Sequence, residues 1–427
     1  MKLLILALAL ALLIGFASGA EQKFSINQTN TTIIFITPEM FGAVGDNSAD
    51  DSTALQAMID YAEANGATIL LPFKSYAFGT ELDIPSGTTI RGVRGRYSWQ
   101  DGYYGSRLRY TGSGNALNLT AASGMRYKIT LEDFALQGAG TSIMNGVGTG
   151  IYAKAVSEFW FRDMDIRGFE TGIYGYDLTI GEVASSDFTW NDQAIYLPYA
   201  SRIAIRDCNI WNNGIGIRQS MTTNVVIENN QFERCTDFLK FDSSKGSGTV
   251  VYRPVISWNN FHSWPDDYTA GDGLAPYWDC HVINVTNQDY ASNTLIINYL
   301  TMMGNWVDVH KTNGHINVNL ATGDSYAYMH FYENSFYGMN TSIVDETGSG
   351  TAVTAWMWNS IPGGKQYASG NVQVAGYSFD WDRTNVLGKL VLNTTLSTTE
   401  GAIWYDTGAN KLKFYNGAAV ETVTSST

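Results

Sequence analysis

Apolar residues recur in the middle of the chain at a fixed interval of 22 residues. Around each apolar anchor, apolar and polar residues alternate as in short strands, and no helical period lies between the strands. Three strands in every 22-residue unit predict the stacked coils of a parallel β-helix, and hence an all-β fold. The three series of anchors are Phe161, Val183, Ile205 and Ile227; Ile166, Phe188, Ile210 and Phe232; and Ile173, Ile195, Ile217 and Leu239.

Asparagines stand two residues before several later anchors, at Asn230, Asn259, Asn334 and Asn359, and Cys208 occupies the same position in its own unit. Stacked asparagines at a coil corner can bond amide to amide along the axis, so we expect a structural ladder. The interval from Phe232 to Phe261 lengthens to 29 residues, and the stretch DSSKGSGTVVYRP is expected to form the extra loop.

The segment STALQAMIDYAEAN, residues 52–65, has a helical pattern. Its apolar residues Leu55, Met58, Ile59 and Ala62 fall on one face. A cluster of carboxylates precedes it, and we expect Asp50, Asp51 or Ser52 to cap the helix, with Asn65-Gly66 ending it. The sequence therefore favours a helix cap over a catalytic role for these acids.

The stretch FGAVGDNSADDSTALQAMIDYAEANGATILLP, followed by SYAFGTELDIPSGTTIRGVRG, resembles the opening of the pectate-lyase-superfamily domain. That domain occurs in secreted polysaccharide enzymes and phage tailspikes. The resemblance implies a right-handed parallel β-helix with an N-terminal capping helix. It implies no single reaction, because the family holds lyases, hydrolases and inactive binders. The chain also lacks the NTD, GHG and RIK set of the polygalacturonases, so no catalytic residue carries over.

The chain divides into four predicted segments. Residues 1–20 have the layout of a signal peptide, 21–37 form an N-terminal extension, 38–377 form the β-helix, and 378–427 contain a linker and a small C-terminal β-module. In this module, turns at 406–410 and 416–417 separate short strands. It resembles the module that ends many viral fibre and tailspike-like proteins, which implies display on a virus particle and admits a homotrimer.

Composition and charge limit the partners. The net charge of −14 argues against nucleic acid as a partner. Only 15% of the residues are charged, and this low fraction with abundant glycine, asparagine and tyrosine is typical of an extracellular β protein. Neither a zinc motif nor a cofactor motif is present, and we expect no cofactor or metal. The three cysteines, Cys208, Cys235 and Cys280, are expected to be buried free thiols. After signal cleavage the protein should be secreted, without membrane insertion.

Strand alternation predicts one outward face that could hold a glycan. Its catalytic candidates are Asp165 and Asp187, one coil apart and hence about 5 Å from each other, as in a retaining glycosidase, with one kept protonated by repulsion. Glu233 is the alternative acid. The bland alternative is an ordinary solvated sheet face. Around the acids we expect Tyr174, Tyr196, Trp211 and Arg218 to bind substrate, with Lys240 continuing the row of Arg218.

The irregular stretch from Phe261 to His281 is a second candidate region, because long loops in compact domains are often functional. Its substrate-binding candidates are His262, Trp264, Asp266 and Trp278. A loop that packs only its own aromatic residues is the competing interpretation.

The sequence favours a glycoside hydrolase acting on a surface or extracellular glycan. A glycan-binding adhesin or tailspike-like virion protein is the first alternative, and a polysaccharide lyase is the second.

Overall fold

The computed structural model describes most of the chain from residue 22 to residue 359 and short strands beyond it. The described residues are 22–26, 31–93, 96–98, 102–142, 145–244, 246, 248–263, 280–287, 293–311, 315–320, 325–339, 342–346, 351–357, 359, 366–370, 372–375, 379–380, 389–390, 403–406, 411–415 and 420–422. The predicted signal peptide at 1–20 lies outside these residues.

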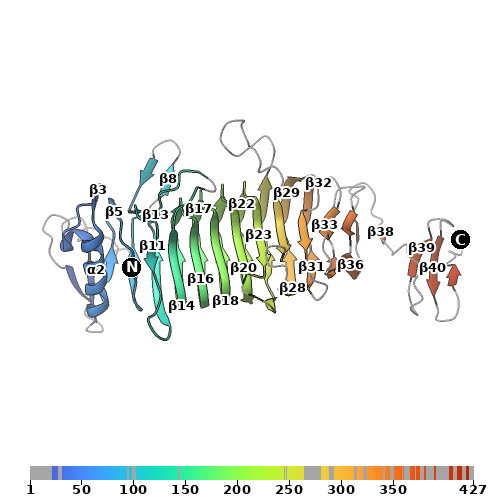
Figure 1. The fold of residues 1–427 in the computed structure, drawn as a ribbon, viewed down its shortest axis with the longest axis horizontal. Coiled ribbons are helices and arrows are strands. Elements are labelled where there is room, and N and C mark those ends of the chain that lie inside the picture. The colour runs from blue at the N-terminus through green and yellow to red at the C-terminus, as the bar shows by residue number, and fades with distance from the viewer. Residues whose placement is uncertain are drawn as a thin grey trace.

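Parallel strands stack along one long axis, with the helix α2 at the N-terminal end of the stack (Figure 1). A representative coil runs through β15 (Asp165–Arg167) and β16 (Thr171–Ala184) before β17 (Asp187–Thr189) starts the next. Each strand pairs in parallel with its counterpart one coil later, for example Ile166 with Phe188. The predicted parallel β-helix and its 22-residue coil are thereby confirmed.

One sheet consists of short strands, and we call it the short-strand sheet. Its strands are β3 (Asp46–Asp50), β5 (Ser75–Phe78), β10 (Arg107–Tyr110), β13 (Ala135–Gln137), β15, β17, β19 (Asn209–Trp211), β22 (Gln231–Glu233), β26 (Asn260–Ser263), β29 (Trp306–Lys311) and β32 (Ser335–Met339).

The other two sides of each coil form a continuous second sheet, the long-strand sheet, because strands such as β16 run through both sides. Its strands are β1 (Gln22–Ile26), β2 (Thr31–Ile36), β4 (Thr68–Leu70), β6 (Leu82–Asp83), β7 (Thr89–Arg91), β11 (Asn115–Asn118), β12 (Arg126–Glu132), β14 (Thr149–Arg162), β16, β18 (Gln193–Arg206), β20 (Ile215–Thr223), β21 (Val226–Glu228), β23 (Asp237–Asp242), β24 (Thr249–Tyr252), β25 (Val255–Ser257), β27 (His281–Thr286), β28 (Leu295–Met303), β30 (Ile316–Asn319), β31 (Tyr326–Tyr332), β33 (Ser342–Glu346), β34 (Thr351–Met357), β35 (Gln366–Gly370) and β36 (Val372–Ala375).

The predicted anchors fill the interior of the coils. Ile166, Phe188, Ile210 and Phe232 are each fully buried. Phe232 stacks on Phe261 of the next coil with 4.8 Å between ring centroids. The three cysteines are buried free thiols, as expected. Burial of such apolar columns is the main force that holds a solenoid together.

An asparagine ladder follows one corner of the stack. The side-chain oxygen of each asparagine accepts the backbone N–H of the preceding rung, and its amide donates to a buried carbonyl. The ladder confirms the predicted positions, includes Cys208 as its first rung, and contains one asparagine that the sequence pattern missed, Asn305. Its rungs are Cys208, Asn230, Asn259, Asn305, Asn334 and Asn359.

The helix α2 (Ser52–Asn65) has the predicted bounds and buries the predicted face, and Gly66 ends it in the left-handed conformation with φ 63°. The capping prediction needs a correction. Asp51 occupies the N-cap position, but its carboxylate accepts the N–H groups of Val44 and Gly45 instead of a helix N–H. Asp50, another of the three predicted candidates, does bind the start of the helix, because it accepts the N–H of Ser52, the first residue of α2.

The N-terminal end of the stack includes a strand that precedes α2. The strand β2, predicted within an N-terminal extension, pairs with β4 and so joins the long-strand sheet, and the 3-10 helix η1 (Pro38–Phe41) follows it. A hairpin of β8 (Arg96–Ser98) and β9 (Gly102–Tyr104) branches from an early coil. Within the part of the chain that the structure describes, no helix has the length and apolarity needed to cross a membrane.

The C-terminal segment contains antiparallel strands in place of coils. A pair of short strands, β37 (Phe379–Asp380) and β38 (Lys389–Leu390), precedes a three-stranded sheet. That sheet consists of β39 (Ile403–Asp406), β40 (Lys411–Tyr415) and β41 (Val420–Thr422), in agreement with the predicted small β-module.

Candidate functional site

The outward face of the short-strand sheet carries two straight rows of side chains. Residues on adjacent strands are paired in register, so side chains of one row follow each other at roughly the 4.8 Å strand spacing. The Asp165 row consists of Asp165, Asp187, Asn209, Gln231, Asn260 and Trp306. The Arg167 row consists of Arg167, Thr189, Trp211, Glu233, His262 and Asp308.

The two leading catalytic candidates are direct neighbours in the Asp165 row. Asp165 and Asp187 are paired residues of β15 and β17. Asp165 is 3% exposed, whereas Asp187 is partly exposed and accepts a hydrogen bond of 2.8 Å from the amide of Asn209. The structure therefore brings the pair together, with Asp187 as the member open to solvent.

The buried arginine beside this pair has an aromatic neighbour. Arg167 is 2% exposed, and its guanidinium carbon lies 4.0 Å from the ring centre of Trp190. Such stacking suits the flat, delocalised cation. Arg167 follows Asp165 by two residues on β15, so its cation stands in the row beside the row of the two carboxylates.

The alternative acid Glu233 lies in the Arg167 row between Trp211 and His262. Its carboxylate is 3.3 Å from the guanidinium of Arg234.

One strand beyond His262 in the same row lies Asp308, which was not among the residues predicted from the sequence. One carboxylate oxygen of Asp308 is buried and finds no hydrogen-bond partner among the described residues. Two carboxylates two strands apart are roughly 10 Å from each other along the row, near the upper limit for an inverting pair.

The predicted tyrosine row lies on the long-strand sheet, so the expected single face is in fact two. Tyr152 and Tyr174 stack with centroids 5.1 Å apart, and Tyr174 meets Tyr196 edge to face at 5.5 Å. Burial raises the pKa of Tyr174 to about 12. Arg218 continues the row: it lies 4.4 Å above Tyr196 and 2.6 Å from the carboxylate of Asp242.

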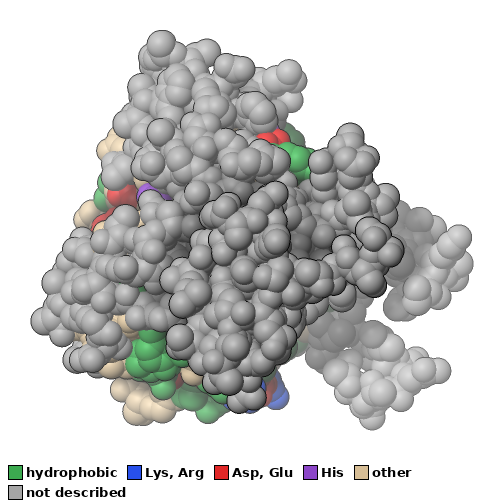
Figure 2. Space-filling model, turned by 90° about the vertical axis from the view of Figure 1, so that its right-hand side faces the viewer, with side chains coloured by type: hydrophobic (Ala, Val, Ile, Leu, Met, Phe, Trp, Pro, Cys, Tyr) green, Lys and Arg blue, Asp and Glu red, His purple; other side chains and the backbone are tan. Residues whose placement is uncertain are grey.

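Tyrosines also reach the surface farther along the long-strand sheet. Tyr299 of β28 and Tyr328 of β31 are exposed and stack with centroids 6.5 Å apart. Figure 2 views the stack from its C-terminal end and colours tyrosine green with the hydrophobic residues. Green side chains reach the surface at the lower side of this view.

The second predicted region is described only at its margins. His262 belongs to the Arg167 row, but Trp264, Asp266 and Trp278 lie outside the described residues. Among the residues that the structure does describe, no group of three His, Cys, Asp or Glu side chains could hold a metal ion.

Comparison with known proteins agrees with the fold. Residues 136–336 match a family described as the right handed beta helix region. The tailspike gp42 of Acinetobacter phage vb_AbaP_AS12 superimposes with a TM-score of 0.55 at 11% sequence identity, over 86% of this chain and 67% of that chain. The chain thus has the right-handed parallel β-helix fold, which it shares with this tailspike.

Two phage proteins are similar in sequence. A capsule K30/K69-specific depolymerase of Klebsiella phage K64-1 is 29% identical over 161 residues, which are 34% of this chain and 19% of the relative. Depolymerase 1 of Klebsiella phage KN3-1, specific for capsule KN3, is 25% identical over 315 residues, which are 65% of this chain and 38% of the relative. The matches span well under half of either relative.

Proposed function

We propose that this protein degrades a polysaccharide of a cell surface or extracellular matrix, acting as a glycoside hydrolase on the outer face of the short-strand sheet. The observation that carries the proposal is the pairing of Asp165 with Asp187 on neighbouring strands. Two carboxyl groups at this spacing suit a retaining mechanism, in which one attacks the sugar and the other protonates the leaving oxygen. The similarity to two capsule depolymerases supports a glycan as substrate.

The shape of the face also suits a chain substrate. Each row runs along the axis, so successive sugars could contact successive coils, with Trp211 beside the acids and Glu233 as the alternative acid. The proposed substrate contacts also include His262 of the same face and, on the long-strand sheet, Tyr174, Tyr196 and Arg218. Trp264, Asp266 and Trp278, which lie outside the described residues, belong to the same proposal. Secretion or display on a virus particle, and assembly as a homotrimer, are part of the same proposal.

The test is an assay of the full chain on purified capsular polysaccharides K30, K69 and KN3 and on a wider glycan panel. New reducing ends without ultraviolet-absorbing unsaturated ends support the hydrolase. Unsaturated ends instead support the lyase, and tight binding with neither product supports the adhesin. A protein that neither binds nor cleaves any glycan would overturn the proposal.

Site variants then identify the acids. Asp165→Asn, Asp187→Asn and Glu233→Gln should each lower turnover at least about a hundredfold if the residue is a catalytic acid or nucleophile. Asp308→Asn is assayed beside them, because Asp308 shares a row with Glu233. Wild-type turnover in both Asp165→Asn and Asp187→Asn would exclude the retaining pair.

A further inference from the structure

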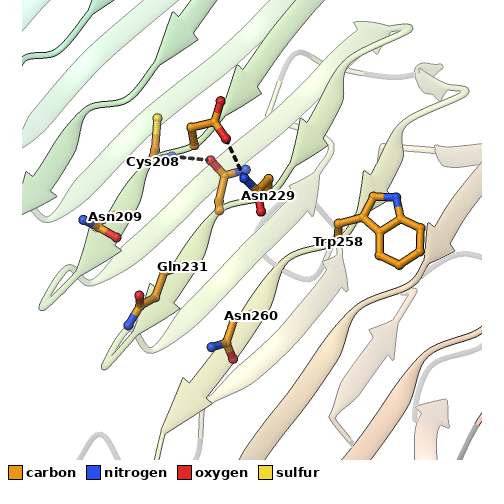
Figure 3. A pocket seen from close by; sticks show the side chains of 8 residues that line it. Cys208, Asn209, Asn229, Gln231, Trp258 and Asn260 are labelled. Atoms are coloured by element: carbon orange, nitrogen blue, oxygen red, sulfur yellow. Dashed lines mark hydrogen bonds between the residues drawn. The ribbon is translucent and has the colours of Figure 1, made fainter.

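One corner of the stack is formed where the chain leaves the long-strand sheet and enters the short-strand sheet. At this corner a cavity of about 290 Å³ lies across the successive coils that contain Cys208, Asn230 and Asn260. Figure 3 shows its lining in two rows, with the Trp258 indole directed away from Gln231 and Asn260. One row stands at the corner itself and the other at the start of the following strand. The corner row is Asp207, Asn229 and Trp258; the strand row is Asn209, Gln231 and Asn260; the floor is Cys208 and Asn230.

The floor of this cavity is rigid and chemically inert. The N–H of Cys208 donates to the side-chain oxygen of Asn230, which fixes both rungs of the asparagine ladder. Burial raises the pKa of the Cys208 thiol to about 12, so the thiol stays protonated and is a poor nucleophile. The cavity is therefore suited to binding and has no covalent chemistry at its base.

Trp258 occupies a backbone position that does not suit it. Its φ is 57°, in the left-handed region, whereas the same corner holds Asp207 and Asn229 in earlier coils and Gly304 in the next one. Asp, Asn and Gly adopt this conformation readily, but a bulky aromatic residue rarely does. The indole is also 58% exposed, so core packing does not explain its presence. The corner conformation itself recurs along the stack, for example at Ser185 and Glu333, so what sets residue 258 apart is its exposed aromatic ring.

The next coil provides a seat for the Trp258 indole. A Cβ atom placed on Gly304 would lie 2.5 Å from Cε3 of the indole, so the ring lies directly over the bare backbone of this glycine. Any other residue at 304 would push the ring away. The indole is thus held in one plane at the rim of the cavity before any ligand arrives, which lowers the entropic cost of binding.

The remaining lining offers hydrogen bonds without positive charge. Within the described part of the chain, the side-chain amides of Gln231 and Asn260 have no hydrogen-bond partner of their own, and no Lys or Arg lines the cavity. The one charged lining group, Asp207, is an anion that accepts a hydrogen bond from Asn229. The flat apolar ring suits the apolar face of one sugar, and the free amides suit the hydroxyl groups of its neighbour in the glycan.

We propose that the corner cavity is a subsite for uncharged sugar residues of a glycan, one stacked on Trp258 and a neighbouring one hydrogen-bonded by Gln231 and Asn260. This inference deepens the proposed function and rests on it. The subsite is continuous with the candidate acids, since Asn209 of the cavity donates to Asp187. A glycan running along the Asp165 row would therefore place a neutral sugar here and its scissile bond one or two coils away.

The experiment compares variants that alter only the stacking surface. On a capsular polysaccharide that the wild-type protein binds, Trp258→Ala should weaken affinity at least about tenfold. The substitution removes the ring on which the sugar stacks. Trp258→Phe should recover part of the loss. Gly304→Ala should weaken binding because it displaces the indole. Its control is Gly87→Ala, which imposes the same substitution at a glycine with φ 77° where the Cβ meets nothing within 4 Å.

The charge of the bound sugar is tested with the same polysaccharide after chemical reduction of its uronic acids to neutral sugars. The tenfold penalty of Trp258→Ala should persist on the reduced polymer and change little with salt. A penalty that disappears on reduction would show that an anionic sugar occupies the cavity and would overturn the assignment.

Failure of the subsite and failure of the proposed function give different results. If the wild-type protein binds or cleaves a glycan and Trp258→Ala matches it with its circular dichroism unchanged, the subsite is refuted and the proposed function stands. If no glycan is bound or cleaved by the wild-type protein, the proposed function fails and the subsite with it.

Discussion

Asp51 shows how a buried carboxylate can hold a loop and a helix together. The side chain is 3% exposed, and its two oxygens accept the N–H groups of Val44 and Gly45 at 2.7 and 3.1 Å. These bonds fasten the loop before β3 to the start of α2. Charged hydrogen bonds of this kind contribute more than neutral ones, and their loss leaves buried amides unpaired.

Replacing Asp51 with Ala should therefore lower the free energy of unfolding by about 2 kcal/mol, measured by urea titration. Asp50→Ala serves as the matched control, because Asp50 bonds the N–H and hydroxyl of Ser52 from a more exposed position. We expect a smaller loss for the control and unchanged glycan turnover per folded molecule in both variants. An Asp51→Ala protein of wild-type stability would contradict the clamp.

The titration of Asp192 makes the folded protein relatively more stable at acidic pH than at neutral pH. Burial, with a lesser contribution from the negative charge of Glu170, raises the pKa of this carboxyl above its ordinary 3.8, and the hydrogen bond from Gly146 only partly offsets them. The folded protein thus holds the proton more tightly than the unfolded chain. The contribution of Asp192 is complete below its unfolded pKa and declines as the pH rises through the raised value.

Asp192→Asn removes this titration and keeps the oxygen that accepts the Gly146 N–H at 3.0 Å. We expect the variant to match the wild type near pH 3 and to be the more stable protein at pH 7, in paired urea titrations. Glu170→Gln, which removes only the repelling charge, should change stability in the same direction by less. A variant that is less stable than the wild type at pH 7 would refute this account.

The asparagine ladder acts at the scale of the coil, where it replaces the hydrogen bonds that a sharp corner removes from the sheets. Asn259 illustrates the role: its amide donates to Ile227 and to Asn305, and its oxygen accepts the N–H of Asn230. Asn259→Ala leaves these buried groups unpaired and should cost roughly 1–3 kcal/mol of unfolding free energy.

The control for the ladder is the neighbouring residue. Asn260 is exposed and takes no part in the ladder, so Asn260→Ala should leave the melting temperature within error of the wild type. Equal destabilisation by both substitutions would mean that the corner backbone, and not the ladder amide, is the sensitive element.

The sequence was most informative where consecutive coils have equal length. Ile166, Phe188, Ile210 and Phe232 repeat at a constant step, so strand, register and inward direction could all be predicted. The next coils vary: 46 residues separate Asn259 from Asn305 and 29 separate Asn305 from Asn334. A variable insertion destroys the period, and for that reason Asn305, Trp306 and Asp308 were missed although they continue rows already identified.

The candidate site was predictable only as a set of rows. Alternation placed Asp165 beside Asp187 because strand pairing fixes neighbours. It could not show that Tyr174 lies on a different sheet, since the turn between β15 and β16 sets that angle. The corner cavity was also invisible: it depends on Trp258 adopting a left-handed backbone, and nothing in the residue type predicts this.

At the scale of the whole molecule, the fold is a one-dimensional stack whose ends need protection. Each coil contacts mainly its two neighbours, so the first coil would expose an apolar cross-section and unpaired strand edges without a cover. The helix α2 supplies that cover, and its residues Leu55, Met58 and Ile59 are each 1% exposed. The cap thus stabilises the stack and also limits association between stacks.

Ile59→Asp separates these two roles of the cap. A charge buried without a partner costs several kcal/mol, enough to displace α2 while coils farther along remain paired. We expect protein that keeps its far-ultraviolet β signal but forms higher oligomers in light scattering, with hydrogen exchange accelerated first in β4 and β7. Glu63→Lys on the exposed side of α2 is the control and should scatter like the wild type. If Ile59→Asp instead unfolds completely, with protection from hydrogen exchange lost equally in β4 and in β28, the coils are coupled more strongly than nearest-neighbour stacking allows.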